Sequence, residues 1–246
     1  MAERDFNRRR LLEAGLVALP LGAAAAGAIG KAGVPWRPDE AAYPLAVDEG
    51  KSYNFFSRAE AAFIVAAVAR MIPADELGGG AIEAGVPIFL DRQLAGEFGQ
   101  GTQWYMRGPW AKGEETQGYQ SRMSPAQMYR AAIAAIDKDT NHAFKVVFAR
   151  LKGPDQDTYL KRLETGDVSL ANVDSKAFFI LFLQNVIEGF FCDPIHGGNR
   201  DMIGWKLIGF PGARYDKRAW VLAFGKPYDL PPVSIGGRPG WLAPKN

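Results

Sequence analysis

The segment KAFFILFLQNVIEGFF, residues 176–191, decides the fold of this protein. It is apolar on nearly every face, as is typical of a helix that either lies in the middle of a bundle or spans a membrane. Its unbroken apolar run ends at Leu183, where polar residues begin, and such a run is too short to cross a bilayer. We therefore expect a buried central helix, with Asp174 or Ser175 as its N-cap.

Apolar residues also recur at helical spacing on the N-terminal side of this segment. Ser57 and Glu60 form a capping-box pattern ahead of the first such stretch, and Pro73 ends it. No alternating run is strong enough to predict a sheet, so the fold class is mainly α, a compact irregular helical bundle with long ordered loops. The expected helices cover residues 57–72, 81–94 with a bend at Pro87, 124–138, 140–151, 154–164 closed by Gly166, and 202–207.

Residues 96–123 are rich in glycine and in aromatic side chains, and they show no lasting period. We expect a long ordered loop here. A stretch of this length without secondary structure is unusual in a compact domain unless it has a function.

The composition excludes several classes of protein. The chain has 246 residues, 48% of them apolar, which suffices for one domain with a real core and excludes disorder throughout. The net charge is +2 and the basic residues are scattered beyond the N-terminus, so we expect no nucleic-acid partner. A single cysteine cannot form an intrachain disulfide, a CxxCH haem site or an iron–sulfur cluster by itself.

The N-terminus has the layout of an export signal. Three consecutive arginines precede a mildly apolar, alanine-rich run that ends in a small-x-small site. The arginines Arg8 and Arg9, followed by Leu11 and Leu12, resemble the twin-arginine signal that exports folded proteins. An amphipathic N-terminal helix is the alternative, but the alanine-rich run has no charged face.

The sequence thus divides into four parts. We expect a twin-arginine signal peptide at residues 1–28, a linker or arm at 29–55, a helical domain at 56–225 and an extended tail at 226–246. The tail contains five prolines in its 21 residues, which is why we expect it to be extended.

The stretch that follows the central helix holds the reactive side chains. Cys192, Asp193, His196 and Asp201 lie close together in sequence and suggest either a zinc site or a Cys–His nucleophile pair. Zinc sites gather three or four well-spaced ligands, whereas this cysteine follows two phenylalanines at the end of a buried helix, where thiols are usually inert. No third group that could orient the histidine is identifiable. We therefore predict no catalytic, cofactor-binding or metal-binding residue in this chain.

A structural interpretation explains more of these residues. Asp193 and Pro194 stop the helix, Gly197-Gly198-Asn199 suits a turn with positive φ, and Gly209, Pro211 and Gly212 form another turn. We expect Asp201 to cap a short helix that presents Trp205. The following side chains are of the kinds that dominate protein interfaces, and we take them as the candidate partner interface: Trp205, Phe210, Arg214 and Tyr215.

The same stretch resembles a known family. DPIHGGNRDMIGWKLIGFPG, residues 193–212, is similar to the signature of the small (gamma) subunit of gluconate 2-dehydrogenase, the subunit 3 family, which usually shows DPxYGGN, then GW, then IGFPG. His196 stands where tyrosine is common. IPADELGGGAIEAGVPIFLDRQL, RGPW, GYQ and YRAAIAAID resemble further parts of the family. The matching positions are Asp193, Pro194, Gly197, Gly198, Asn199, Gly204, Trp205, Ile208, Gly209, Phe210, Pro211 and Gly212.

The resemblance implies a complex. Members of the family accompany a large FAD-dependent flavoprotein that oxidises a sugar or sugar acid, and a cytochrome c subunit passes the electrons, through haem c, to the membrane quinone pool. The large subunit carries the flavin and the catalytic residues and generally has no export signal of its own. The small subunit is implied to assist its maturation and to carry it through the twin-arginine translocase to the periplasmic face of the inner membrane.

Three alternatives stay open. The partner could be a related glucose, fructose or sorbitol dehydrogenase. The chain could instead be a stand-alone periplasmic enzyme that uses Cys192 and His196. It could also be a sugar-binding protein with Trp104, Trp110 and Trp205 as stacking platforms.

Overall fold

A computed structural model of the chain describes residues 53–111, 113–214, 220–226 and 231–235. The expected signal at 1–28, most of the arm at 29–55 and candidate interface residue Tyr215 therefore lie outside the described residues. Within these ranges the chain is helical and contains no β-strand, only isolated bridges, so the prediction of a mainly α fold is confirmed.

The first described helix, α3 (Arg58–Met71), begins where the capping-box pattern predicts. The Ser57 side chain accepts a hydrogen bond from the Glu60 N–H, and the Glu60 carboxylate accepts one from the Ser57 N–H. Phe63, Ile64 and Val68 are completely buried, so one face of the helix belongs to the core.

The next helix, α4 (Val86–Ala95), is shorter than expected. The prediction of a helix from residue 81 with a bend at Pro87 was wrong, because Gly85 takes a left-handed φ of 76° and separates a turn from the helix. Pro87 lies in the first turn of α4, where its missing N–H costs nothing. A short helix, α5 (Glu97–Gln100), follows directly after Gly96.

The long loop predicted at 96–123 is largely irregular, apart from α5 and the 3₁₀ turn η1 (Glu115–Gln117). It ends at Ser124, which caps α6 (Pro125–Phe144). This helix runs six residues beyond the expected end and includes much of the segment at 140–151, because Thr140 is buried and bonds back to the Ile136 carbonyl. Lys145, with a left-handed φ of 62°, terminates it.

A 3₁₀ turn and a further helix lead to the central helix. The chain passes through η2 (Phe148–Arg150) and α7 (Gly153–Thr165), which closes at Gly166 as predicted. Asp174 then caps α8 (Ser175–Phe191) by accepting a hydrogen bond from the Ala177 N–H.

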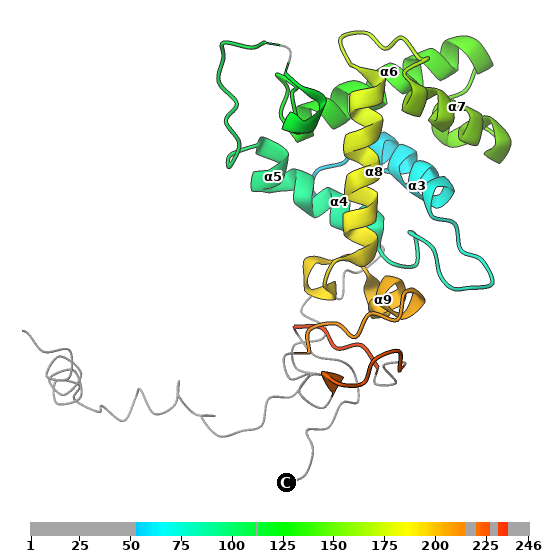
Figure 1. The fold of residues 1–246 in the computed structure, drawn as a ribbon. Coiled ribbons are helices and arrows are strands. Elements are labelled where there is room, and N and C mark those ends of the chain that lie inside the picture. Colours follow the sequence, from blue (N-terminus) through cyan, green and yellow to red (C-terminus); the bar gives the residue numbers. More distant parts are fainter. Residues whose placement is uncertain (1–52, 112, 215–219, 227–230, 236–246) are drawn as a thin grey trace, which may run out of the picture. The chain divides into compact units, whose positions relative to one another are not determined.

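Helix α8 organises the core. It packs against α3, α4, α6 and α7, and α9 (Ile203–Leu207) lies at its C-terminal end (Figure 1). Phe178 and Phe182 are completely buried and stack on each other, with ring centroids 5.7 Å apart. The polar Asn185 is also buried, and its Oδ1 accepts a hydrogen bond of 2.9 Å from the Tyr129 hydroxyl, so it adds no unpaired group to the core.

One stripe of α8 does not face the core. Ile180, Gln184 and Ile187, which share a helix face by their spacing, are exposed. The sequence, apolar on nearly every face, did not reveal this stripe. Across the described ranges, none of the helices combines the length and the apolar content that a membrane span requires.

Candidate functional site

The stretch that follows α8 folds into a compact loop of three short turns. It contains η3 (Pro194–His196), η4 (Arg200–Met202) and then α9. Gly197, Gly209 and Gly212 have φ values of 92°, 66° and 73°, so the predicted turns with positive φ are present.

Asn199 holds this loop together. It is completely buried, and its Nδ2 donates a 2.8 Å hydrogen bond to the carbonyl of Cys192. Its Oδ1 accepts one of 2.8 Å from the Gly204 N–H, in the first turn of α9. The expectation that Asp201 caps this helix was wrong, because Asp201 is exposed in a left-handed conformation and Asn199 satisfies the free N–H instead.

Two glycines of the signature are required by close backbone approaches. A Cβ atom on Gly198 would overlap the carbonyl oxygen of Gly189, and one on Gly204 would overlap that of Phe190. Both carbonyls belong to the last turn of α8. Any larger residue at either position would therefore push the loop away from the helix end.

Residues 233–235 are bound to the same loop. The carboxylate of Asp193 accepts hydrogen bonds from the Ser234 hydroxyl at 2.6 Å and from the Ile235 N–H at 2.8 Å. Ala213 donates its N–H to the carbonyl of Val233. Asp193 therefore joins the helix end to a segment more than 40 residues later in the chain.

The four candidate interface residues divide between the interior, the surface and the undescribed part of the chain. Trp205 is 5% exposed and donates its Nε1–H to the carbonyl of Phe191, a placement that favours a core role. Phe210 lies edge-on against Trp205 and is 42% exposed. Arg214 is half-buried and donates to the carbonyl of Pro231.

Sequence reasoning did not single out Leu207 and Ile208, which are also exposed, at 45% and 60%. With Phe210 they form a run that we call the apolar segment 207–210. These three large apolar side chains are close in sequence and each is at least 42% exposed, as is common at protein interfaces.

The reactive side chains of the loop are placed unfavourably for nucleophilic catalysis. Burial, aided by the negative charge of Asp193, raises the pKa of the Cys192 thiol to about 11, although hydrogen bonds lower it in part. The thiol contacts the carbonyl of Gly189, whereas His196 is exposed. Among the described residues, no three His, Cys, Asp or Glu side chains come close enough together to hold a metal ion.

The sequence model of one family, described as Gluconate 2-dehydrogenase subunit 3, matches residues 58–212. The chain belongs to this family. The resemblance inferred from the signature is thus confirmed, and the match runs from the first residue of α3 to the last glycine of the signature. No match was found among curated proteins or among solved structures.

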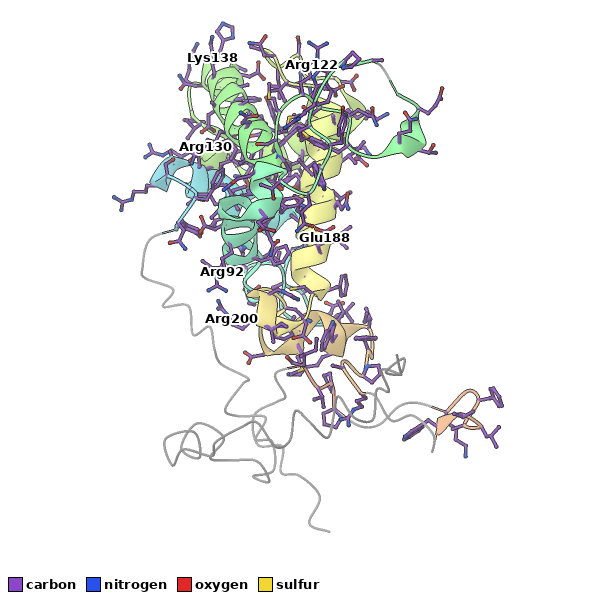
Figure 2. The ribbon with its side chains drawn as sticks, turned by 90° about the vertical axis from the view of Figure 1, so that its left-hand side faces the viewer. Arg92, Arg122, Arg130, Lys138, Glu188 and Arg200 are labelled. Carbon is purple, nitrogen blue, oxygen red and sulfur yellow. The ribbon has the colours of Figure 1, made fainter. Side chains whose placement is uncertain are left out.

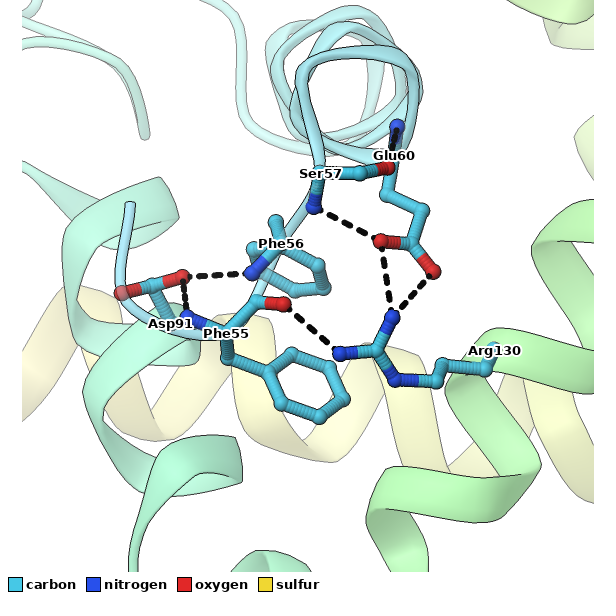
Figure 3. Close-up of polar contacts among 6 residues, drawn as sticks. All are labelled: Phe55, Phe56, Ser57, Glu60, Asp91 and Arg130. Carbon is cyan, nitrogen blue, oxygen red and sulfur yellow. Dashed lines mark hydrogen bonds and ion pairs between the residues drawn. The ribbon is translucent and has the colours of Figure 1, made fainter. Parts of the chain in front are cut away.

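The subunit 3 match begins just after an anchored stretch of backbone. The buried carboxylate of Asp91 accepts hydrogen bonds from the N–H groups of residues 54–56, at 2.7 to 2.9 Å. Arg130 donates to the carbonyl of Phe55, covers its ring at 4.3 Å and pairs with Glu60 (Figure 3). The C-terminal end of the expected arm at 29–55 is therefore fixed to the subunit 3 domain.

A pocket of about 410 Å³ lies where α4, α5 and the following turn meet. The Asp91 anchor was not predicted, because Asp91 and residues 54–56 come from separate segments with no shared motif. The pocket lies within the single segment 92–104, of which the sequence singled out only Trp104, as a stacking platform. Its lining residues are Arg92, Gln93, Gly96, Glu97, Phe98, Gly101, Gln103 and Trp104.

Proposed function

We propose that this chain is the non-catalytic small subunit of a periplasmic, membrane-associated, FAD-dependent gluconate 2-dehydrogenase complex. In this proposal the FAD belongs to the large subunit and the haem c to a cytochrome c subunit. The chain assists the maturation of the large flavoprotein subunit and carries it through the twin-arginine translocase. Its family membership supports the place in such a complex.

One observation carries the proposal. Two polar residues of the signature form hydrogen bonds inside the chain: Asn199 fixes the loop to α8, and Asp193 fixes it to residues 234 and 235 of the tail. Beside exposed polar side chains such as His196 and Lys206, the loop exposes the apolar segment 207–210 to solvent. A rigid loop that presents apolar side chains suits a binding role, because its ordering cost has been met before the partner arrives.

The state of Cys192 supports a non-catalytic role. A nucleophilic cysteine acts as a thiolate, whereas burial keeps the thiol of Cys192 protonated near neutral pH. This disfavours the stand-alone enzyme that the sequence left open.

Co-purification of the large subunit tests the contact surface. We expect Ile208→Asp and Phe210→Asp to weaken this association about thirtyfold or more, because each places a charge in an apolar contact. The matched control is Leu77→Asp, since Leu77 is 74% exposed and lies in the turn that follows α3. Unchanged association of both signature variants would contradict the proposed surface. The substrate that the purified complex oxidises then distinguishes gluconate from glucose, fructose or sorbitol.

A second experiment tests the export role, which rests on Arg8, Arg9, Leu11 and Leu12 outside the described residues. We expect the double variant Arg8→Lys with Arg9→Lys to leave both this chain and the large subunit in the cytoplasm, while Arg10→Lys does not. If the flavoprotein still reaches the periplasm with full activity in the double variant, the proposed export role is wrong.

A further inference from the structure

Residues 220–226, with the sequence WVLAFGK, form a turn that is largely exposed. Among the described residues, Phe224 and Leu222 are the most exposed large apolar side chains, at 84% and 83%, and Val221 is 64% exposed. We call this segment the apolar turn 220–226. Soluble proteins rarely expose several large apolar side chains in one short segment unless a partner covers them.

The apolar turn 220–226 is folded rather than extended. The Ala223 N–H donates to the carbonyl of Trp220 at 3.0 Å, and the Lys226 N–H donates to the carbonyl of Ala223 at 3.2 Å. Gly225 takes a left-handed φ of 67°, which glycine adopts without strain. Figure 2 draws the side chains of this segment as sticks around the turn. Backbone hydrogen bonds shape the segment, and they leave its exposed apolar side chains available for a partner.

The charge around this turn is positive. Lys226 is exposed, and Lys217 and Arg218 precede the turn in the sequence, outside the described residues. From residue 217 to residue 226 the sequence contains these three basic residues and no acidic one, although Asp216 comes just before them. The whole chain has 29 basic and 27 acidic residues, so this stretch has a local excess of positive charge that attracts an anionic surface.

Large apolar side chains beside lysines favour a lipid surface over a protein surface. Protein interfaces are depleted in lysine. At a bilayer the same residues are compatible, since apolar side chains enter the acyl boundary, lysine and arginine reach the phosphates, and tryptophan suits the headgroup level. An anionic bilayer therefore fits both the apolar and the charged residues of this stretch.

We propose that the apolar turn 220–226 inserts into the headgroup region of an anionic lipid bilayer. Leu222 and Phe224 enter the boundary with the acyl chains, and Lys226 pairs with lipid phosphate groups. Such a contact is shallow and needs no membrane-spanning helix. The proposal goes beyond the function proposed above, which requires no lipid contact by this chain. It also stands without that function, because the exposure and the charge of the turn belong to the chain itself.

A fluorescent label at residue 222 tests the proposal on the full chain. Cys192 is the only cysteine, so Cys192→Ser with Leu222→Cys carries one thiol, which takes an environment-sensitive fluorophore. The probes are vesicles of phosphatidylcholine alone and of an equal mixture with phosphatidylglycerol. We expect a saturable blue shift with the anionic vesicles and at least about tenfold weaker binding to the neutral ones. Because the label reports on its own surroundings, it does not detect vesicles that are bound only through the basic N-terminus.

Leu77 provides the matched control position for the label. It is 74% exposed, and its neighbours in sequence include the acidic residues Asp75 and Glu76. The label in Cys192→Ser with Leu77→Cys should show no shift with either kind of vesicle. An equal shift at both positions, or no shift at residue 222 with anionic vesicles, overturns the proposal.

Two further substitutions in the chain labelled at residue 222 separate the apolar contribution from the charge. Phe224 and Lys226 are both exposed, so their variants should fold. Phe224→Asp should weaken binding to anionic vesicles about tenfold or more. Lys226→Glu should weaken it about fivefold or more. Unchanged binding of either variant contradicts the assignment.

Two other partners would give distinct results with the same label. A shift that appears without vesicles as the protein concentration rises would indicate a second copy of the chain. A shift that appears only when the large subunit is added would indicate that subunit. Either result overturns the lipid contact, and only the second would support the function proposed above.

Discussion

Trp205 donates a 2.7 Å hydrogen bond from Nε1 to the carbonyl oxygen of Phe191, and this bond ties α9 to the last residue of α8. Trp205→Phe keeps an aromatic ring but removes the donor, so we expect the free energy of unfolding to fall by about 1–3 kcal/mol. Trp205→Ala should cost about 3–5 kcal/mol. Urea denaturation measures both, and the large subunit should still bind wherever the variant is folded. An unchanged unfolding curve with lost association would instead assign Trp205 to the interface.

Asn199 is the second predicted source of stability. Asn199→Ala removes the acceptor of the Gly204 N–H and the donor to Cys192, and we expect a loss of about 2–4 kcal/mol on chemical denaturation. Asn141→Ala is the matched control, because Asn141 is exposed on α6 and should change stability by no more than about 0.5 kcal/mol. Equal effects of the two substitutions would show that the Asn199 bonds contribute little.

The hydrogen bonds to Asp91 should hold residues 54–56, the end of the expected arm, in place. Asp91→Asn keeps the shape of the side chain, but its single carbonyl oxygen cannot accept from all three N–H groups of residues 54–56. We expect these amides to exchange hydrogen about tenfold faster or more, while the core of α8 stays protected. Asp157→Asn breaks only an exposed pair with Arg70 and should leave this exchange unchanged. Slow exchange in Asp91→Asn would mean that other contacts hold the arm.

The raised pKa of Cys192 predicts that both the alkylation rate of the thiol and the stability of the fold depend on pH. Alkylation of the thiol should be slow at pH 7 and should accelerate about tenfold per pH unit until close to pH 11, because only the thiolate reacts. The unfolded thiol ionises near pH 8.5–9, below the folded one. The protonated thiol therefore contributes stability that is fully present below that pH and is lost as the pH rises towards 11.

Alkylation rates and urea unfolding of the wild type and of Cys192→Ser, both measured from pH 7 to 11, check these effects. A plateau in the alkylation rate below pH 9 would show that the thiol is not shielded by burial. The serine of Cys192→Ser does not titrate in this range. The loss of stability that the thiol causes as the pH rises towards 11 should therefore be absent from this variant.

Local patterns determined the helices. Each correct start follows from chemistry within a few residues: Ser57 with Glu60, Ser124 with Pro125, and Asp174 ahead of α8. The mistaken bend at Pro87 has a local cause that the sequence did not reveal, since the left-handed φ of Gly85 separates the preceding turn from α4. Helix lengths depended on burial, as at Thr140, and burial is a property of the packed chain.

The candidate site required the tertiary structure. By itself, the sequence determined a helical chain, a family signature and a short list of aromatic residues. It could not show that Trp205 is buried while Phe210 is exposed, because this difference arises from the end of α8, which covers only Trp205. It also could not place Asp193 against Ser234 or Arg92 against Gly197, since these contacts join segments far apart in the chain. Periodicity and capping act over a few residues, whereas burial and pairing of charges depend on which segments the folded chain brings together.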